Sequence, residues 1–264
     1  MNAVRDPRYY VSVSIDAPRA YLRRLAAAGA VDVWRVPLGT YANDASLSAA
    51  EQMRAERRIG DERRRFVVSH AATRAIVADY LDVPPSELRM EMRYGDKPRL
   101  ANARLEISLA HSGDLALVAL ATTPVGVDLE RMDDLPDDEL DDLAEFSLTR
   151  RELDAFAALD PPRRRHAFLR VWTRKEAYLK AIGKGIAERA MAEIDVSAGD
   201  AAPRLIAAGD DEINSFALID LDPAPGFVGA VAVAADDVAV TLHDWDPAPA
   251  AASATVGEPD RAVS

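Results

Sequence analysis

The chain contains no cysteine among its 264 residues, which excludes disulfide bonds and thiolate zinc sites. It also lacks any run of about 20 apolar residues, the length that a helix needs to cross a bilayer. The N-terminal segment MNAVRDPRYYVSVSID has neither the length nor the cleavage pattern of a signal peptide. These absences predict a cytoplasmic protein that does not act at a membrane.

A net positive charge is missing as well, since the formal net charge is −12. General nucleic-acid binders usually show the opposite balance, so we expect no nucleic-acid partner. Basic residues nevertheless crowd two short stretches, which could offer basic patches to an anionic ligand. These residues are Arg54, Arg57, Arg58, Arg63, Arg64 and Arg65 in the first stretch, and Arg163, Arg164, Arg165, Arg170, Arg174 and Lys175 in the second.

Hydrophobic periodicity predicts helices followed by antiparallel strands in each half of the chain. In the first half we expect a helical stretch over residues 49–81 that Gly60 interrupts, and strands at 9–15, 31–38, 88–93, 105–109, 115–121 and 125–130, with a short helix at 18–28. The pair Thr123-Pro124 suggests a hairpin between the last two strands. In the second half we expect helices at 137–145, 149–159 and 163–182, then strands at 216–221, 226–235 and 238–245.

Two carboxylates alternate with apolar residues in the segment GVDLE. On a strand, Asp128 and Glu130 point to one face, while Val127 and Leu129 point to the other and can anchor the strand in a core. Neighbouring carboxylates repel each other unless a cation or a proton relieves them, and such oxygen ligands suit Mg²⁺. Taken alone, these residues favour a simpler interpretation, a solvated strand edge with two surface acids.

The segment WTRKEAYLKAIGKG lies at the end of the strongest predicted helix. Glu176 and Lys180 are four residues apart and therefore share a helix face. The pair is compatible with an ordinary intrahelical salt bridge. It is equally compatible with a third carboxylate for a metal ion and an ammonium group for phosphates. Gly183 and Gly185 suit the C-terminus of this helix.

Several segments, taken together and in this order, resemble the Sfp-type 4′-phosphopantetheinyl transferases. They are GDKPRL, SLAHSGD, GVDLE, FSLTRREL and WTRKEAYLKAIGKG. The resemblance spans about residues 47–186, and its specific parts are GVDLE and the pattern W-x-x-K-E-A-x-x-K-x-x-G-x-G. One departure is Ala110, where the family often has a serine that contacts the adenosine end of coenzyme A.

The family resemblance implies an α+β fold of two similar halves with pseudo-twofold symmetry. Each half would pack an antiparallel sheet on helices, and coenzyme A would bind in the cleft between them. We expect an N-terminal half at residues 1–124 and a C-terminal half with the metal site at 125–246. The tail at 247–264 is rich in Ala, Pro and Ser, which predicts disorder. The pseudodimer implies a monomeric protein.

The resemblance also implies a function, the Mg²⁺-dependent transfer of 4′-phosphopantetheine from coenzyme A to a serine of an apo acyl or peptidyl carrier protein, with release of 3′,5′-ADP. Fatty-acid, polyketide and nonribosomal-peptide carriers are all compatible with it. The implied metal ligands are Asp128, Glu130 and Glu176. The implied cofactor-binding residues are Lys97, His111, Lys180, Lys175, Arg54 and Arg65. Glu176 and Lys180 would be catalytic, with Glu176 as the general base, and Glu152 matches a further family glutamate.

Two other functions use the same residues. One is a different Mg²⁺-dependent phosphotransferase, although the G-x-x-x-x-G-K-[ST] phosphate loop is absent from the sequence. The other is a non-catalytic module that binds coenzyme A or a carrier protein. The basic run at residues 163–174 could meet the acidic surface of a carrier, where charge complementarity would mainly raise the association rate, or it could be a solvated helix end.

Overall fold

The computed structural model describes residues 25, 29–39, 46–85, 87–91, 99–100, 105–184, 191–198, 202–208 and 216–246. The strand expected at 9–15, most of the helix expected at 18–28, Lys97, Gly185 and the tail at 247–264 lie outside these residues. The described chain combines helices with sheets that are mostly antiparallel, which confirms the α+β class. No helix in this part is both long enough and apolar enough to cross a membrane.

The first part of the chain forms two helices and several strands, namely β1 (Ala30–Pro37), α2 (Ala49–Glu56), α3 (Gly60–Leu81), β2 (Met90–Glu91), β3 (Arg99–Leu100), β4 (Glu106–Ser112) and β5 (Leu115–Ala121). Ser48 caps the N-terminus of α2 in a capping box with Glu51. The Ser48 hydroxyl accepts from the backbone N–H of Glu51, and the Glu51 carboxylate accepts from the backbone N–H of Ser48. The helical stretch is interrupted as predicted: residues 57–59 separate the two helices, and Gly60 is the first residue of α3. Of the strand expected at 88–93, residues 90 and 91 form β2, and residues 92 and 93 lie outside the described residues.

The second part contains β6 (Val125–Arg131), η3 (Met132–Asp134), α4 (Asp137–Ser147), α5 (Arg150–Ala157), α6 (Pro161–Ile182), η4 (Met191–Glu193), β7 (Ile194–Val196), β8 (Leu205–Ala208), β9 (Ala217–Leu221), β10 (Phe227–Val233) and β11 (Ala239–Asp244). Prolines occupy the first turn of α6, where a missing N–H costs nothing. Gly183 ends this helix in the left-handed conformation at φ 71°. Strands β7 and β8 were not predicted.

The strands form two main sheets, with the orders β11-β1-β5-β4 and β6-β10-β9. The hairpin predicted between β5 and β6 is wrong, because β1 and β4 occupy both edges of β5 and β6 pairs with β10 instead. The tight hairpin is the one between β4 and β5, where Gly113 adopts a positive φ of 52°. β11 pairs with β1 in parallel, so the end of the described chain returns to the sheet that contains its first strand.

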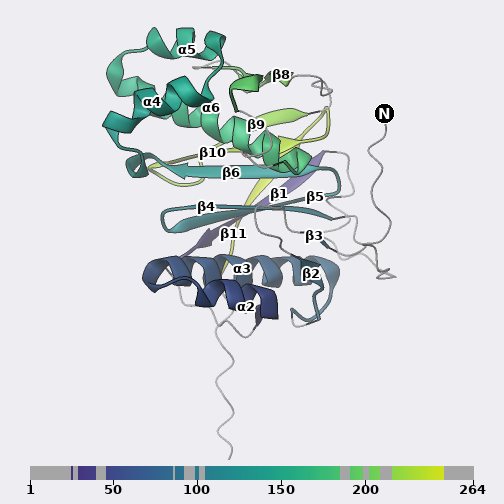
Figure 1. Cartoon of the computed structure of the whole chain (residues 1–264). Coiled ribbons are helices and arrows are strands. Elements are labelled where there is room, and N and C mark those ends of the chain that lie inside the picture. The colour runs from purple at the N-terminus through teal and green to yellow at the C-terminus, as the bar shows by residue number, and fades with distance from the viewer. Residues whose placement is uncertain are drawn as a thin grey trace, which may run out of the picture.

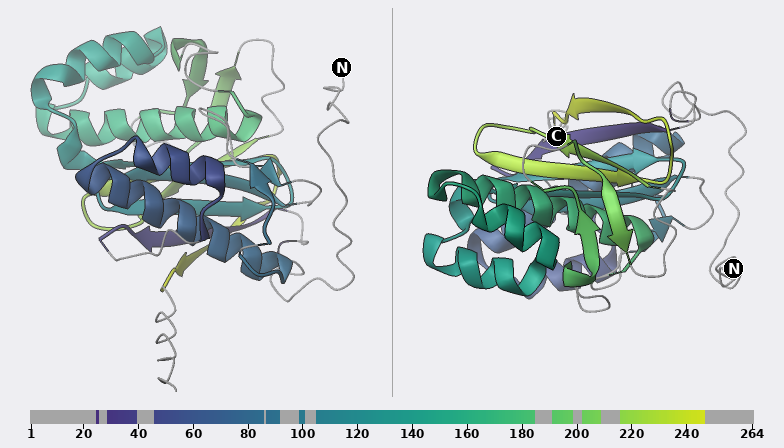
Figure 2. Two further views of the ribbon diagram at one scale, coloured as in Figure 1. Left: turned by 60° about the horizontal axis from the view of Figure 1, so that its bottom comes forward. Right: turned by 90° about the horizontal axis from the view of Figure 1, so that it is seen from above.

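Helices cover the outer faces of the two sheets, and the inner faces pack together (Figure 1). One core lies between α3 and the first sheet, and a second lies between α6 and the sheet of β6 and β10. A third core fills the space between the sheets, where β5 is buried along its whole length. The view from above in Figure 2 shows α4, α5 and α6 grouped together. This layering places β6 directly under α6.

Candidate functional site

Strand β6 directs its two sets of side chains as the sequence predicts. Val127 and Leu129 are buried in the core between the sheets, at 0% and 1% exposure. Asp128 and Glu130 occupy the opposite face, toward α6, because side chains alternate along a strand. Asp128 is buried and Glu130 is half-buried, so neither belongs to the solvated strand edge that was the simpler interpretation.

Helix α6 approaches β6 so closely that only a glycine fits at position 126. A Cβ atom on Gly126 would lie 2.0 Å from the carbonyl oxygen of Ala177 and 2.5 Å from the backbone nitrogen of Ala181. These are backbone atoms, which cannot move aside without moving the helix. The glycine of the GVDLE segment therefore sets the height of Glu176 and Lys180 above the carboxylates of β6.

The ammonium group of Lys180 lies 2.7 Å from Oδ1 of Asp128 and forms a salt bridge with it. Burial raises the pKa of Asp128, and the charge and hydrogen bond of Lys180 offset only part of that effect. Burial opposes the charged form of Lys180, but Asp128, and then Glu176 and Glu130, hold its pKa above the usual value. The lysine and three carboxylates thus share one electrostatic environment.

Glu176 and Glu130 both have a pKa raised to about 7, through burial first and then through the nearby charge of Asp128. Glu130 adds to the raised pKa of Glu176, whereas Lys180 lowers the pKa of both glutamates and the hydrogen bond from Ser112 lowers that of Glu130. Two buried oxygens, Oδ2 of Asp128 and Oε1 of Glu176, have no hydrogen-bond partner among the described residues. A buried carboxylate oxygen without a partner is costly, so this arrangement calls for a cation.

The donor set fits Mg²⁺, which prefers oxygen ligands and keeps waters or substrate phosphates in its shell. The acids do not form a closed cage, however. Among the described residues, no three His, Asp or Glu side chains are already arranged as a metal-binding cluster. An incomplete set of protein ligands is what a site needs if a diphosphate is to supply the rest of the shell. Asp128, Glu130 and Glu176 are the side chains that could hold the ion.

Basic side chains from the first half of the chain lie next to this acidic group. His111, on β4, has a pKa lowered by partial burial of the ring and then by the positive charges of Lys180, Arg65 and Arg58. Arg54 lies close enough to His70 to help lower the pKa of that residue. The structure therefore brings Arg54, Arg65 and His111 into one basic region beside Lys180.

Two further residues lie in this region: Arg58, which the sequence indicated only as part of the first basic stretch, and His70, which was not predicted. Burial lowers the pKa of His70 to about 3, so the ring is neutral, and it stacks on Phe66 with centroids 3.8 Å apart. The guanidinium carbon of Arg58 lies 4.2 Å from the centroid of the same Phe66 ring. The spacing of Phe66 and His70, four residues apart on a helix, is the signal that could have indicated the stacked pair.

Lys175 and Glu152 lie away from the site, in the core under α5. Both side chains are 0% exposed, and the ammonium group lies 2.5 Å from Oε2 of Glu152. Lys175 also donates to the carbonyl oxygens of Ser147 and Met191. A contact between Lys175 and coenzyme A would require these bonds to break, so its cofactor-binding role stays a prediction without support from the geometry.

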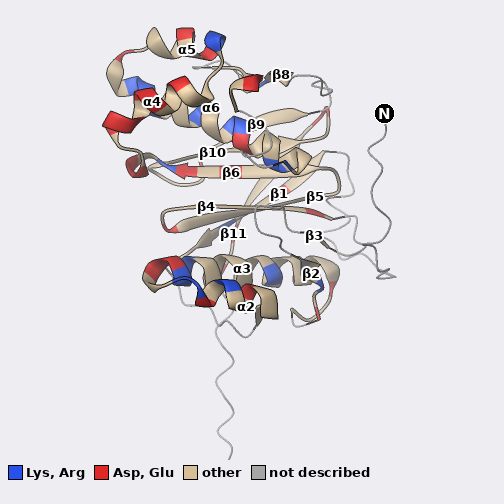
Figure 3. Cartoon of the chain, viewed as in Figure 1, with Lys and Arg blue, Asp and Glu red and all other residues tan. Residues whose placement is uncertain are grey.

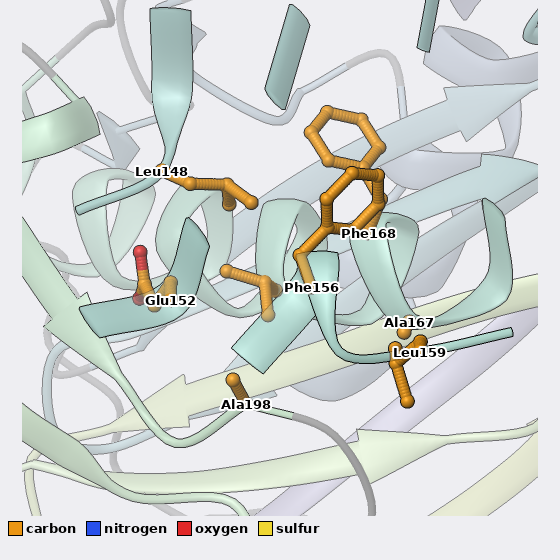
Figure 4. A pocket seen from close by; sticks show the side chains of 8 residues that line it. Leu148, Glu152, Phe156, Leu159, Ala167, Phe168 and Ala198 are labelled. Carbon is orange, nitrogen blue, oxygen red and sulfur yellow. The ribbon is translucent and has the colours of Figure 1, made fainter. Parts of the chain in front are cut away.

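A small pocket borders this ion pair, and its walls are almost entirely apolar (Figure 4). It is lined by Leu148, Glu152, Phe156, Leu159, Ala167, Phe168, Val171 and Ala198. These surroundings explain why Glu152 needs its partners: besides Lys175, it accepts from the backbone nitrogens of Thr149 and Val196. Glu152 thereby joins α5 to α6 and β7.

The basic run at residues 163–174 is largely engaged within the protein. Arg174 is fully buried and, with Arg170, pairs with Asp220, while Arg165 pairs with Asp137. In the ribbon of Figure 3, acidic residues are gathered on α4, next to basic residues of α6. A carrier-binding role for this run stays a prediction, and these pairs give most of it a structural role.

Comparisons with known proteins point to one family. A family model described as the 4′-phosphopantetheinyl transferase superfamily matches residues 124–232, which include β6 and α6. The chain is 34% identical to the 4′-phosphopantetheinyl transferase HetI of Nostoc sp., over 77% of this chain and 87% of that protein. It is 30% identical to a phosphopantetheinyl transferase of Thraustochytrium sp., over 78% of this chain and 75% of that protein.

Among solved structures, a holo-(acyl-carrier-protein) synthase from Bacillus anthracis in complex with CoA (3′,5′-ADP) matches 44% of this chain and 97% of its own. Its sequence identity is 26% and the TM-score is 0.36. The holo-[acyl-carrier-protein] synthase of Thermotoga maritima matches 44% of this chain and 64% of its own, with 22% identity and a TM-score of 0.34.

Proposed function

Because this chain belongs to the 4′-phosphopantetheinyl transferase superfamily, we propose that it transfers the 4′-phosphopantetheine group of coenzyme A to a serine of an apo carrier protein in a Mg²⁺-dependent reaction that releases 3′,5′-ADP. The observation that carries this proposal is the position of Lys180 and Glu176 over the carboxylates of β6, with two buried oxygens of Asp128 and Glu176 lacking partners among the described residues. We further propose that the protein acts as a monomer in the cytoplasm.

Asp128, Glu130 and Glu176 would hold the magnesium ion in this proposal. When bound, the ion supplies positive charge that neutralises the diphosphate of coenzyme A and the charge that develops on the departing phosphate. Burial and mutual repulsion disfavour the ionised forms of these acids, and two of their buried oxygens have no partner among the described residues, so a divalent cation would relieve both costs. The residues present therefore fit the group that the family implies.

Lys180 and the basic region of the first half would bind the rest of coenzyme A. The ammonium group of Lys180, already beside Asp128, adds a fixed positive charge where negative charge develops. His111, Arg54 and Arg65 offer donors and positive potential for the 3′-phosphate end. Lys97 is also proposed for that end, from the sequence alone.

The reaction itself is a displacement at phosphorus. The carrier serine oxygen bonds to the phosphorus that bears the pantetheine arm, and the bond from that phosphorus to the bridging oxygen breaks. The bond electrons leave with 3′,5′-ADP, and the serine loses a proton. Glu176 is the proposed acceptor, because its carboxylate lies on the site face of α6 and its Oε1 has no hydrogen-bond partner among the described residues. A carboxylate within hydrogen-bond reach of the serine hydroxyl, directly or through one water, can take this proton.

The direct test mixes the purified protein, Mg²⁺, coenzyme A and an apo carrier protein, and follows the intact mass of the carrier. We expect a gain of one phosphopantetheine group, together with 3′,5′-ADP, and no gain when EDTA is present. Glu176→Gln should abolish transfer, while the control Glu145→Gln, on the exposed surface of α4, should retain it. Transfer at the parent rate by Glu176→Gln would remove this residue from the mechanism.

The same experiment separates the two alternatives. A non-catalytic module would bind coenzyme A or the carrier without any mass gain, whereas a different phosphotransferase would consume a nucleotide without modifying the carrier. Several carriers should be tried in parallel, from fatty-acid, polyketide and nonribosomal-peptide synthesis, since the proposal does not distinguish among them. Failure with all of them under Mg²⁺ would overturn the proposed function.

A further inference from the structure

Strand β6 lies at the edge of its sheet, and serines from the other sheet cover that edge. Among the described strands β6 pairs only with β10, so every second backbone N–H of β6 points away from its own sheet. The backbone nitrogens of Val127 and Arg131 each donate to a serine hydroxyl of β4, over 3.0 Å in both cases. The acceptors are Ser108 and Ser112, which are spaced four residues apart just as their donors are. These bonds join the two sheets next to the site, where β4 and β6 lie side by side (Figure 1).

Ser112 makes a second hydrogen bond, and no corresponding bond of Ser108 to a carboxylate is present among the described residues. The Ser112 hydroxyl donates to Oε2 of Glu130 over 3.0 Å. A hydroxyl has a single proton, and the backbone nitrogen of Arg131 can act only as a donor. The bond from Arg131 therefore uses a lone pair of the Ser112 oxygen and leaves the proton for Glu130. Because Ser112 is 9% exposed, water competes little for either bond.

We propose that Ser112 is a positioning residue that fixes one carboxylate oxygen of Glu130 and so orients this side chain for the metal ion. The inference rests on the proposed function. It assigns to the first half of the chain a role in shaping a metal site whose acidic residues all come from the second half. Side chains that hydrogen-bond a metal ligand restrict its orientation, and their loss typically weakens metal binding or activity by about 10- to 100-fold.

The chain contains its own matched control. Ser108 lies on the same strand and face, is 1% exposed, and accepts from β6 over the same distance. Its partner Val127 has an apolar side chain in the core between the sheets. Ser108→Ala and Ser112→Ala each remove one acceptor from the edge of β6, but only the second releases a carboxylate. A purely structural role would give both variants the same behaviour.

The experiment measures metal binding directly. Mn²⁺, standing in for Mg²⁺, is titrated into the parent protein and the two alanine variants with coenzyme A present, and the free ion is followed by electron paramagnetic resonance. We expect Ser112→Ala to bind about 10-fold more weakly than the parent. Ser108→Ala should stay within about twofold of the parent, because its hydroxyl contacts no ligand. The Mg²⁺ concentration for half-maximal transfer should shift in the same order.

A second pair of variants covers the case in which Ser112→Ala does not fold. Ser112→Thr and Ser112→Val have nearly the same shape and differ in the hydroxyl, so only the threonine variant should bind Mn²⁺ like the parent. Equal binding by these two, or by Ser112→Ala and Ser108→Ala, would overturn the inference. Transfer by the parent protein is measured separately. If the parent protein transfers the group and Ser112→Ala binds Mn²⁺ normally, only the role of Ser112 is contradicted. If the parent protein neither transfers the group nor binds Mn²⁺, the proposed function is contradicted as well.

Discussion

Lys180 lies 2.7 Å from Asp128, and this salt bridge joins α6 to β6 in the middle of the site. Because Lys180 contributes the positive charge and Asp128 is buried, we expect Lys180→Met to reduce kcat for carrier modification by about 100-fold or more, as loss of a preorganised charge does. Steady-state kinetics at saturating coenzyme A measure this effect. The control is Lys184→Met, just beyond the end of the helix. Loss of only a few-fold in Lys180→Met would show that the lysine serves stability rather than transfer.

The pH dependence of stability should follow from the two glutamates with raised pKa values. Glu130 and Glu176 titrate near pH 7 in the folded protein and near 4.5 when unfolded, so the folded state binds more protons between these values. Stability therefore falls as pH rises from about 4.5 to about 7, and each pKa unit corresponds to about 1.4 kcal/mol. The metal-free protein should melt at a higher temperature at pH 5.5 than at pH 8. Calorimetry checks this, and the double variant Glu130→Gln, Glu176→Gln should flatten the profile.

Stabilisation of the folded protein by Mg²⁺ should have the opposite pH dependence and increase as the pH rises. A divalent cation binds the ionised carboxylates, and it stabilises the folded state by mass action. We expect millimolar Mg²⁺ with coenzyme A to raise the melting temperature at pH 8 more than at pH 5.5, where protons compete for Glu130 and Glu176. Differential scanning fluorimetry with and without EDTA measures the shift. An equal shift at both pH values would place the ion elsewhere.

Gly126→Ala should damage both stability and transfer. The added Cβ would contact backbone atoms of α6 at 2.0 and 2.5 Å, so the helix has to move and take Glu176 and Lys180 with it. Overpacking of this kind typically costs about 1–3 kcal/mol, which urea unfolding would measure. Gly39→Ala is the matched control, since a Cβ there meets nothing within 4 Å. Parent-like activity in Gly126→Ala would mean that the height of α6 above β6 does not matter.

Lys175→Met should separate a structural role from a cofactor-binding one. Removal of one partner from a buried ion pair leaves Glu152 charged and unpaired, which typically costs about 3–5 kcal/mol. We expect a large loss of stability in urea unfolding, while the protein that remains folded should bind coenzyme A with unchanged affinity. A tenfold weaker affinity in the folded variant would restore the role that the sequence resemblance implies.

The regular elements and the acidic part of the site could be predicted from the sequence because their signals are local. Alternation placed Asp128 and Glu130 on one face, and prolines and a glycine marked the ends of α6. The partner of β6 could not be predicted, because the turn at Thr123-Pro124 resembles a hairpin and nothing local shows that both edges of β5 are already occupied. The same holds for Ser112, whose role depends on a contact between two sheets. β7 and β8 span three and four residues, too few for a period to show.

The parallel pairing of β11 with β1 also bears on how the protein is made. β1 gains this neighbour only when residues 239–244 are available, so a growing chain cannot complete the pairing of its first sheet until these residues have left the ribosome. The buried carboxylate of Asp32 accepts from Tyr80 early in synthesis, but its contact with His243 has to wait. The two halves are therefore not independent folding units in sequence order, and the last strand completes the half that was synthesised first.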